Sequence, residues 1–377
     1  MGEQFEQRAV PFFDYRRVFS EMESEFVDIF RDVLRRGAFI MQSDLINFEK
    51  ACADFLGVKY AFGVGNATDG LHFALRAAGV GAGHEVLVPG HTMVATPAAV
   101  VFAGATPVLV DIGEDHLMDS SQLPAALTPR TRAIMPVHVN GRSCDMLAIS
   151  AFAKEHGLAI VEDAAQAMGS RFGGRFSGTW GDAAAFSFYP AKVLGCLGDG
   201  GLVVTGDDDI AESIMRLRDH GRGSDGVVRD WGLNSRLDNL QAAFLAAQFK
   251  RYPAVIEHRR ELARCYEEGL ASLDGLLLPP GPHSDPQRLD IFQNYEIRSP
   301  KRDTLKAFLA KHEIGTLIQW GGSAPHHFSD LQLNCSLPKT DEFFEECIML
   351  PLNPAVSPED VDYVCDRIRA FFSAQEL

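Results

Sequence analysis

The sequence lacks the features of a disulfide-stabilised, metal-binding or membrane-spanning protein. Its seven cysteines are odd in number and form no CxxC pair, which favours reduced thiols and a cytoplasmic location. No HExxH motif is present, and the adjacent His326 and His327 are poorly spaced for a metal-binding helix face. No apolar run is long enough to span a bilayer, and the first residues contain no signal-peptide core. We therefore expect no metal and no membrane partner.

The chain also has no excess of positive charge. Its formal net charge of −16 at pH 7 argues against a nucleic acid or an anionic membrane as the main partner. A small anionic substrate stays compatible with this charge, because a helix N-terminus can hold a phosphate locally. With 46% hydrophobic and 23% charged residues, the composition is that of an ordinary globular protein.

Short apolar segments alternate with helical patterns over most of the chain. Strands that are apolar throughout and separated by helices indicate a mostly parallel sheet with helices on both faces, hence an α/β fold. The seven predicted strands are residues 60–64, 85–88, 106–110, 133–137, 158–162, 183–188 and 202–205.

A chain of 377 residues exceeds the size at which a single core keeps growing, so we expect two domains. A large α/β domain should cover residues 1–250, and a smaller α+β domain should cover residues 251–377. Apolar spacing predicts one amphipathic helix over 15–36 and a long helix over 236–270, kinked at Pro253.

Further elements are expected on either side of that division. Ser357, Pro358 and Asp360 are strong start signals for the final helix. The other predicted elements are helices around 43–56, 68–78, 147–156 and 303–312 and a strand around 292–297.

Lys192 is the first candidate for chemistry. It follows a predicted buried strand and a turn at Tyr189-Pro190, and glycines follow it. Desolvation disfavours an ammonium ion, and the neutral amine is the form that makes a Schiff base. An ordinary surface lysine after a strand fits the same stretch and stays open as an alternative.

Three other features occur in a fixed order before this lysine. A glycine-rich turn over residues 62–70 leads into a helix at Thr68 and would suit a phosphate, or Thr68 could simply cap the helix. Asp163 follows a middle strand, where open α/β sheets bind ligands, or it could cap the next helix. Ser187 ends the strand before Lys192. A pyridoxal phosphate enzyme needs phosphate-binding groups, a carboxylate for the pyridinium nitrogen and an amine. The glycine-rich turn, Asp163, Ser187 and Lys192 could supply these groups, and they occur in this order along the chain.

Long stretches of the chain resemble the DegT/StrS family of sugar aminotransferases, which have the fold type I architecture of the aspartate aminotransferase superfamily. The resemblance extends from Pro11 over almost the whole sequence. The segments that carry it are GNATDGLHFALRAAGVGAGHEVLVPGHTMVAT, GATPVLVDI, LTPRTRAIMPVHVNG, IVEDAAQAMGSRFGGR, FSFYPAKVLGCLGDGG and GLNSRLDNLQAAFL.

The resemblance implies pyridoxal 5′-phosphate as cofactor and a role for each matching residue. Lys192 corresponds to the lysine that forms the internal aldimine and then moves the proton between Cα and C4′. Asp163 corresponds to the partner of the pyridinium nitrogen. Gln166 corresponds to the residue that contacts the 3′-oxygen of the ring.

The phosphate contacts implied by the resemblance come from several segments. Thr68, Asp69 and Ser187 correspond to contacts made within one chain. Asn234 corresponds to an asparagine that reaches the phosphate from the neighbouring subunit. The resemblance therefore implies a homodimer with a shared active site.

The sequence departs from the family pattern at three places. Met93 stands where many relatives carry an aromatic residue that stacks on the cofactor ring, and a thioether can still lie on the ring. Asn140 replaces a frequent tyrosine. A His-Tyr-Pro segment of relatives is replaced by residues 319–322, QWGG. We expect these positions to face the substrate.

The resemblance implies ping-pong transamination from an amino donor, L-glutamate, to a nucleotide-linked 3- or 4-keto-6-deoxysugar. A smaller acceptor, such as a keto-inositol, a keto-sugar acid or a phosphorylated ketone, stays open. So does a dehydratase using the same cofactor, although Lys192 argues for transamination. A non-catalytic regulator on the same fold is a further alternative.

Overall fold

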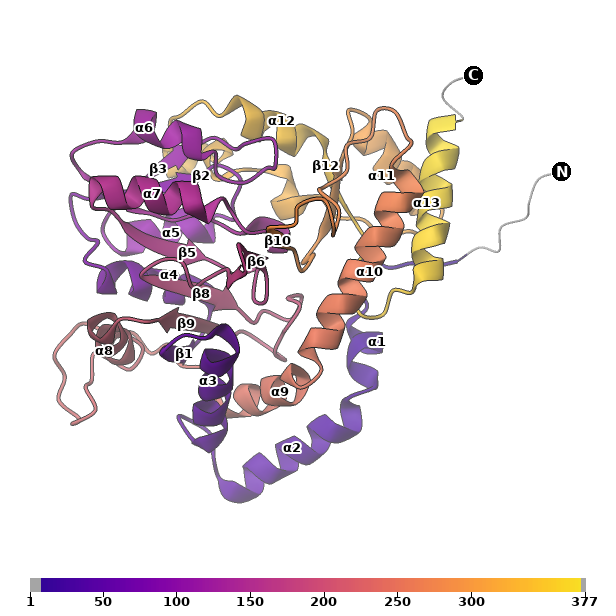
Figure 1. The fold of residues 1–377 in the computed structure, drawn as a ribbon. Helices are drawn as coiled ribbons and strands as arrows, with labels where there is room; N and C mark the ends of the chain where they lie inside the picture. Colours follow the sequence, from indigo (N-terminus) through magenta and orange to yellow (C-terminus); the bar gives the residue numbers. More distant parts are fainter. Residues whose placement is uncertain (1–7, 374–377) are drawn as a thin grey trace.

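The computed structural model describes residues 8–373 and contains the predicted seven-stranded sheet (Figure 1). Its strands follow the order β1-β9-β8-β5-β4-β2-β3, and within this sheet β9 runs antiparallel to its neighbours while the other strands are parallel. They are β1 Tyr60–Val64, β2 Glu85–Pro89, β3 Thr106–Val110, β4 Thr131–Ile134, β5 Ala159–Asp163, β8 Ala183–Ser187 and β9 Gly201–Thr205. All seven overlap the predicted ranges, so the mostly parallel α/β sheet is confirmed.

Helices cover both faces of this sheet. On one face Leu71 and Ile214 pack against Val203, and on the other Phe48 and Leu245 belong to the core around Phe186 and its neighbouring strands. Alternate residues of each strand therefore serve two different cores. The helices are α3 Ser43–Leu56, α4 Ala67–Ala77, α5 Ala95–Phe102, α6 Leu123–Ala126, α7 Met146–His156, α8 Asp208–Leu217 and α9 Asn239–Phe249.

The predicted helix over 15–36 is two helices, α1 Tyr15–Ser20 and α2 Glu23–Arg36. The chain turns between them, where the N–H of Met22 donates to the carbonyl of Phe19. Apolar residues on both sides of the turn pack in one cluster with Phe244 of α9. Their helical spacing reflects this shared packing, and the prediction of one continuous helix was wrong.

The predicted helix over 236–270 is likewise divided, into α9 and α10 Tyr252–Leu270. Pro253 lies in the first turn of α10, where no helical partner for a backbone N–H exists, so proline is tolerated there. A new helix starts at this point, and the predicted kink within one helix was wrong.

The C-terminal part of the chain builds a separate apolar core. Residues of α10, α11 Arg302–Lys311 and α13 Pro358–Ser373 pack around β11 Tyr295–Arg298 and β12 Cys347–Leu350. Figure 1 shows α10 and α13 side by side along this core.

Two local signals decide where elements of this part begin. β11 starts three residues later than predicted, because Phe292 has a φ of 51°, in the left-handed region that a strand excludes. The final helix starts as predicted: the N–H of Ser357 donates to Asp360, whose own N–H donates back to the Ser357 hydroxyl.

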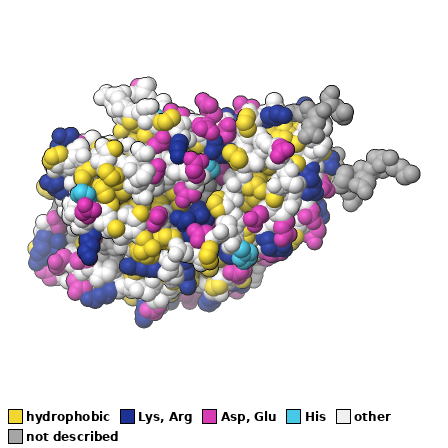
Figure 2. Space-filling view, turned by 45° about the horizontal axis from the view of Figure 1, so that its top comes forward, with side chains coloured by type: hydrophobic (Ala, Val, Ile, Leu, Met, Phe, Trp, Pro, Cys, Tyr) yellow, Lys and Arg dark blue, Asp and Glu magenta, His cyan; other side chains and the backbone are white. Residues whose placement is uncertain are grey.

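The remaining elements are short or lie at the surface. Within residues 8–373 no helix is long and apolar enough to cross a membrane. On the face seen in Figure 2, basic and acidic side chains are interspersed. The short elements are β6 Arg171–Phe172, β7 Arg175–Phe176, β10 Arg288–Leu289, α12 Pro338–Glu346 and the 3-10 turns Ser120–Gln122, Val139–Gly141, Gln319–Gly322, Pro325–His327 and Ser329–Leu331.

Candidate active site

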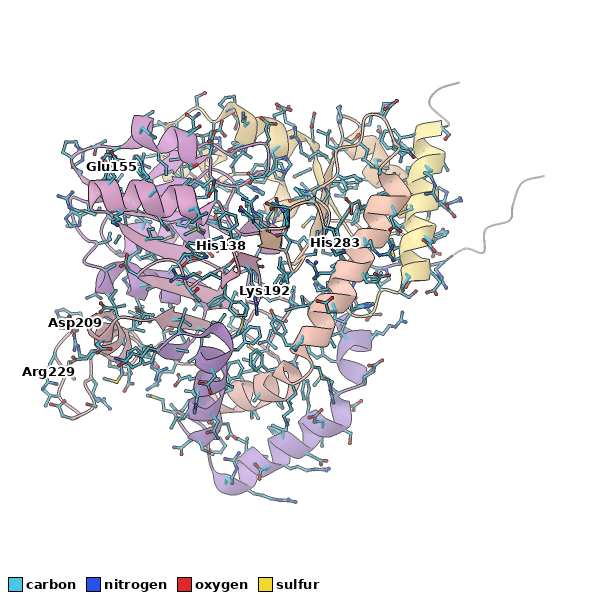
Figure 3. The ribbon with its side chains drawn as sticks, viewed as in Figure 1. His138, Glu155, Lys192, Asp209, Arg229 and His283 are labelled. Atoms are coloured by element: carbon cyan, nitrogen blue, oxygen red, sulfur yellow. The ribbon has the colours of Figure 1, made fainter. Side chains whose placement is uncertain are left out.

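A cavity of about 540 Å³ lies where β5 and β8 end. Trp320, from the QWGG segment, contributes to its wall. Figure 3 shows Lys192 near the middle of the molecule, between the sheet and α10. The residues singled out from the sequence that line this cavity are Thr68, Met93, Asp163, Gln166, Ser187 and Lys192.

Lys192 is held in a tight turn and faces this cavity. Its N–H donates to the carbonyl of Tyr189 at 2.8 Å. Desolvation lowers the pKa of its amine to about 8, and the negative charge of Asp163 opposes part of that shift. A substantial fraction of the amine is therefore neutral near physiological pH, which an ordinary surface lysine would not be.

Asp163 is the last residue of β5, and its side chain is buried. One oxygen accepts from the Thr96 hydroxyl at 2.7 Å and the other from the N–H of Ala165 at 3.1 Å. Burial raises the carboxyl pKa, and these hydrogen bonds together with Lys192 act in the opposite direction. The chain continues into turns rather than a helix, so Asp163 is not a helix cap.

The N-terminus of α4 forms one end of the cavity. Asn66 caps this helix by accepting from the N–H of Asp69 at 2.9 Å, so Thr68 is not the cap. Thr68 lies in the first turn, where backbone N–H groups have no partners within the helix and the dipole is positive. Gly201 permits this arrangement, because a Cβ there would lie 2.6 Å from the carbonyl carbon of Asn66.

Two of the implied phosphate contacts lie outside the cavity lining. The carboxylate of Asp69 accepts from the Ser235 hydroxyl at 2.6 Å and from the Asn66 amide at 3.0 Å. Because a carboxylate accepts hydrogen bonds, a phosphate contact by Asp69 would have to come from its backbone N–H, which donates to Asn66. Asn234 is exposed in the loop after α8, and its role in a neighbouring subunit's site stays a prediction.

Of the residues that differ from the family pattern, some line the cavity and others are buried next to it. Met93 and Trp320 line the cavity, with Met93 50% exposed at its edge. Asn140 and Gln319 lie behind them in a buried polar network, in which the Asn140 amide donates to Glu296 at 2.6 Å. Desolvation raises the pKa of Glu296 to about 7, against the effect of Asn140.

The sequence reasoning missed Thr92 and Thr96, which contact each other at 2.5 Å and link to Asp163. Both lie within the quoted segment GHTMVAT, where two hydroxyls four residues apart in an apolar stretch were an available signal. It also missed Gln293, which contacts the loop of Lys192 from the C-terminal part of the chain.

His326, His327 and Asp341 form a cluster whose potential ligand atoms lie within 4.8 Å of one another. Both histidine Nε2 atoms contact the same Asp341 oxygen, at 2.7 and 2.9 Å. The N–H of Ala324 donates to Nδ1 of His327, which places that imidazole's proton on Nε2. A metal would have to displace this proton, so the geometry is that of a hydrogen-bonded cluster.

Comparison with known proteins identifies the family. The model of the DegT/DnrJ/EryC1/StrS aminotransferase family matches residues 20–369. The chain belongs to this family. It is 39% identical to a dTDP-3-amino-3,4,6-trideoxy-alpha-D-glucose transaminase of Streptomyces venezuelae, over 98% of both chains. It is also 37% identical to a protein named pleiotropic regulatory protein of Geobacillus stearothermophilus, over 96% of this chain and 98% of that one.

A solved structure confirms the fold type I architecture. The crystal structure of DesV from S. venezuelae, in complex with a ketimine intermediate, matches with a TM-score of 0.92 and 38% identity. The match covers 96% of this chain and 98% of DesV. The protein is thus a pyridoxal phosphate-dependent aminotransferase of this family.

The residues of the cavity fit that cofactor. The Lys192 amine, with its pKa lowered to about 8, suits the aldehyde. The buried Asp163 carboxylate suits the ring nitrogen, and the N-terminus of α4 suits the phosphate. Gln166 accepts from the N–H of Asn140 through Oε1, which leaves its amide N–H groups to donate to a ring oxygen.

Proposed function

We propose that this aminotransferase moves an amino group from L-glutamate to the keto group of a nucleotide-linked 3- or 4-keto-6-deoxysugar. The observation that carries the aminotransferase chemistry is the presence of Lys192 and Asp163 in one cavity. Similarity over nearly the full length to a dTDP-amino-deoxysugar transaminase supports the substrate class.

In this proposal pyridoxal phosphate, when bound, supplies an aldehyde for the amine and a ring that takes up an electron pair. Lys192 Nζ would hold the cofactor through its aldehyde, and as a free amine, whose pKa burial lowers to about 8, it would serve as the base. In that role the Lys192 amine would accept the proton from the donor's Cα and carry it to the cofactor.

Other side chains of the cavity bind and orient the cofactor in this proposal. Asp163 holds the proton on the ring nitrogen, and Thr96 orients the Asp163 carboxylate. Thr68 and Ser187 bind the phosphate, Gln166 donates to the ring oxygen, and Met93 lies against the ring.

A homodimer is part of the proposal, with Asn234 completing the partner's site. Apolar side chains that monomers usually bury are exposed, among them Trp231 at 93% in the loop that contains Asn234. On α2, Phe30 is 45% and Leu34 is 50% exposed, next to an apolar groove of about 590 Å³.

We also propose a cytoplasmic location. All seven cysteines are free, which fits a reducing compartment. The proposed nucleotide-linked substrate fits the same compartment.

The test is an amination assay with ¹⁵N-labelled glutamate and a panel of keto acceptors. We expect label in an amino sugar when a dTDP-linked keto-6-deoxysugar is offered, and none with Lys192→Ala. Preferential labelling of a keto-inositol, a keto-sugar acid or a phosphorylated ketone would contradict the substrate class alone. Deoxysugar formation without label transfer would indicate a dehydratase. Full activity of Lys192→Ala would contradict the chemistry as well.

A further inference from the structure

Gln293, just before β11, contacts both peptide groups that flank Lys192. Its Oε1 accepts from the N–H of Val193 at 3.0 Å, and its Nε2 donates to the carbonyl of Ala191 at 2.9 Å. The side chain is buried, with Gln293 6% exposed. Because one planar amide binds the residue before and the residue after the lysine, it restricts rotation of the lysine's own backbone.

Gln293 is itself fixed through its main chain. Its N–H donates to the carbonyl of Asn140 at 2.9 Å, and its carbonyl accepts from Arg259 at 2.7 Å. Arg259 is 2% exposed and also donates to the carbonyl of Phe292 at 3.0 Å. Hydrogen bonds from a charged donor are stronger than those from a neutral one. The bonds from Arg259 therefore hold the main chain from which the Gln293 side chain extends.

The same segment also holds the loop that orients Gln166. The N–H of Asn140 donates to Oε1 of Gln166 at 2.6 Å. The Asn140 side chain accepts from Asn294 at 2.7 Å and donates to Glu296 at 2.6 Å. Residues 293–296 therefore connect two groups that reach the cavity from different strands of the large sheet.

We propose that Gln293 is a positioning residue for the Lys192 amine, acting through the peptide groups on either side of the lysine. This inference rests on the proposed function, because it assigns the purpose of that positioning to cofactor binding. The amide keeps the lysine directed into the cavity, and its main chain ties that direction to the loop of Gln166.

Gln293→Met tests this, because methionine is close in size to glutamine but makes neither hydrogen bond. The matched control is Gln248→Met, since Gln248 donates to the carbonyl of Gly195 at 2.9 Å, further along the same loop. The first measurement is hydrogen exchange of the full-length protein without cofactor, read at the Val193 amide. The second is the affinity for pyridoxal phosphate.

For Gln293→Met we expect exchange at Val193 to rise and cofactor affinity to fall, each by about tenfold or more. A tenfold change corresponds to about 1.4 kcal/mol, the scale of one lost buried hydrogen bond. Gln248→Met should leave both quantities within about threefold of wild type. Equal behaviour of the two variants, in exchange and in affinity, would overturn the proposal.

Gln293→Glu keeps the test decisive if the methionine variant does not fold. Its carboxylate still accepts from Val193 but cannot donate to Ala191. We expect near-wild-type exchange at Val193 and weakened cofactor binding, whereas unchanged cofactor affinity would overturn the proposal. A wild-type protein that binds no pyridoxal phosphate would instead refute the proposed function, while the exchange of the cofactor-free protein still tests the contact.

Discussion

At the scale of single residues, Lys192 and Asp163 are each destabilised in their charged forms by burial and each stabilised by the other. Thr96 and the N–H of Ala165 add hydrogen bonds that favour the charged carboxylate. An acid in this setting can stay ionised opposite a ring nitrogen, while the amine loses its proton easily. The chemistry proposed for the cavity depends on this combination of an ionised carboxylate and an amine that is readily deprotonated.

Asp163→Asn should lower kcat about 10²–10⁴-fold if the full loss of a buried charge pair, roughly 3–5 kcal/mol, falls on the transition state. Steady-state kinetics with glutamate and the keto sugar measure this. The control is Asp145→Asn, which alters the cap of α7. A change below threefold for Asp163→Asn would mean that this residue does not hold the ring nitrogen.

The cofactor-free protein should show an amine at Lys192 that titrates near pH 8. Because its pKa is lowered from the usual 10.5, the neutral amine should appear as the pH rises through about 8. Competitive acylation followed by peptide mass analysis gives the rate at Lys192 as a function of pH. In Asp163→Asn the opposing charge is lost, so the midpoint should move to lower pH; a move to higher pH would contradict the pairing.

At the scale of elements, the strands were predictable because most of them are largely apolar runs, and burial on both faces of the sheet leaves a direct record in the sequence. The breaks within the two long predicted helices could not be predicted from the sequence. Packing against Phe244 continues across the turn at Met22, so the apolar spacing of α1 and α2 looks uninterrupted. The left-handed φ of Phe292, which delays β11, left no signal in the side chain either.

The residues of the site likewise fall into two groups, those that the sequence predicts and those that it does not. Asp163 ends one recognisable strand and Lys192 follows another, so their position at one sheet edge follows from the topology. Thr96 and Gln293 act through contacts with residues far away in sequence, 67 residues from Asp163 for the former and 100 from Val193 for the latter. The spacing of Thr92 and Thr96 marks a polar pair in the sequence, but tertiary packing decides which distant residue a side chain contacts, and local patterns do not encode that.

Gly201→Ala tests the packing of β9 against the start of α4. The added Cβ would lie 2.6 Å from the carbonyl carbon of Asn66, so the helix N-terminus must shift and cofactor affinity should fall about tenfold or more. Gly206→Ala is the control, because nothing lies within 4 Å of its added Cβ. Titration with pyridoxal phosphate gives both affinities. Equal values would show that the close contact between Gly201 and Asn66 does not shape the end of the cavity that we propose binds the phosphate.

At the scale of the whole molecule, the C-terminal core is distinct from the cores of the large sheet, and Val10 from the N-terminal segment packs in it. We propose the predicted division near residue 250 on the basis of these separate cores, with the segment around Val10 packed on the smaller domain. Trp320 then reaches the cavity from the smaller domain, and Gln293 contacts the Lys192 loop from the same domain. The site would therefore depend on the contact between the two domains.

The proposed sharing of the active site between two subunits makes a prediction for mixed dimers. Lys192→Ala and Asn234→Ala should each be nearly inactive as homodimers. A dimer with one copy of each would contain one site with both changes and one with neither, so mixing and subunit exchange should restore activity. Kinetics before and after exchange measure this. Absence of recovery, in dimers shown by mass to be mixed, would mean that each site uses its own Asn234.

The central claim is a covalent bond between pyridoxal phosphate and the ε-amine of Lys192. Borohydride reduction of the protein with its cofactor, followed by protease digestion and mass spectrometry, measures it most directly. The account predicts one phosphopyridoxyl group, on the peptide containing Lys192. A label on another lysine, or none at saturating cofactor, would contradict it.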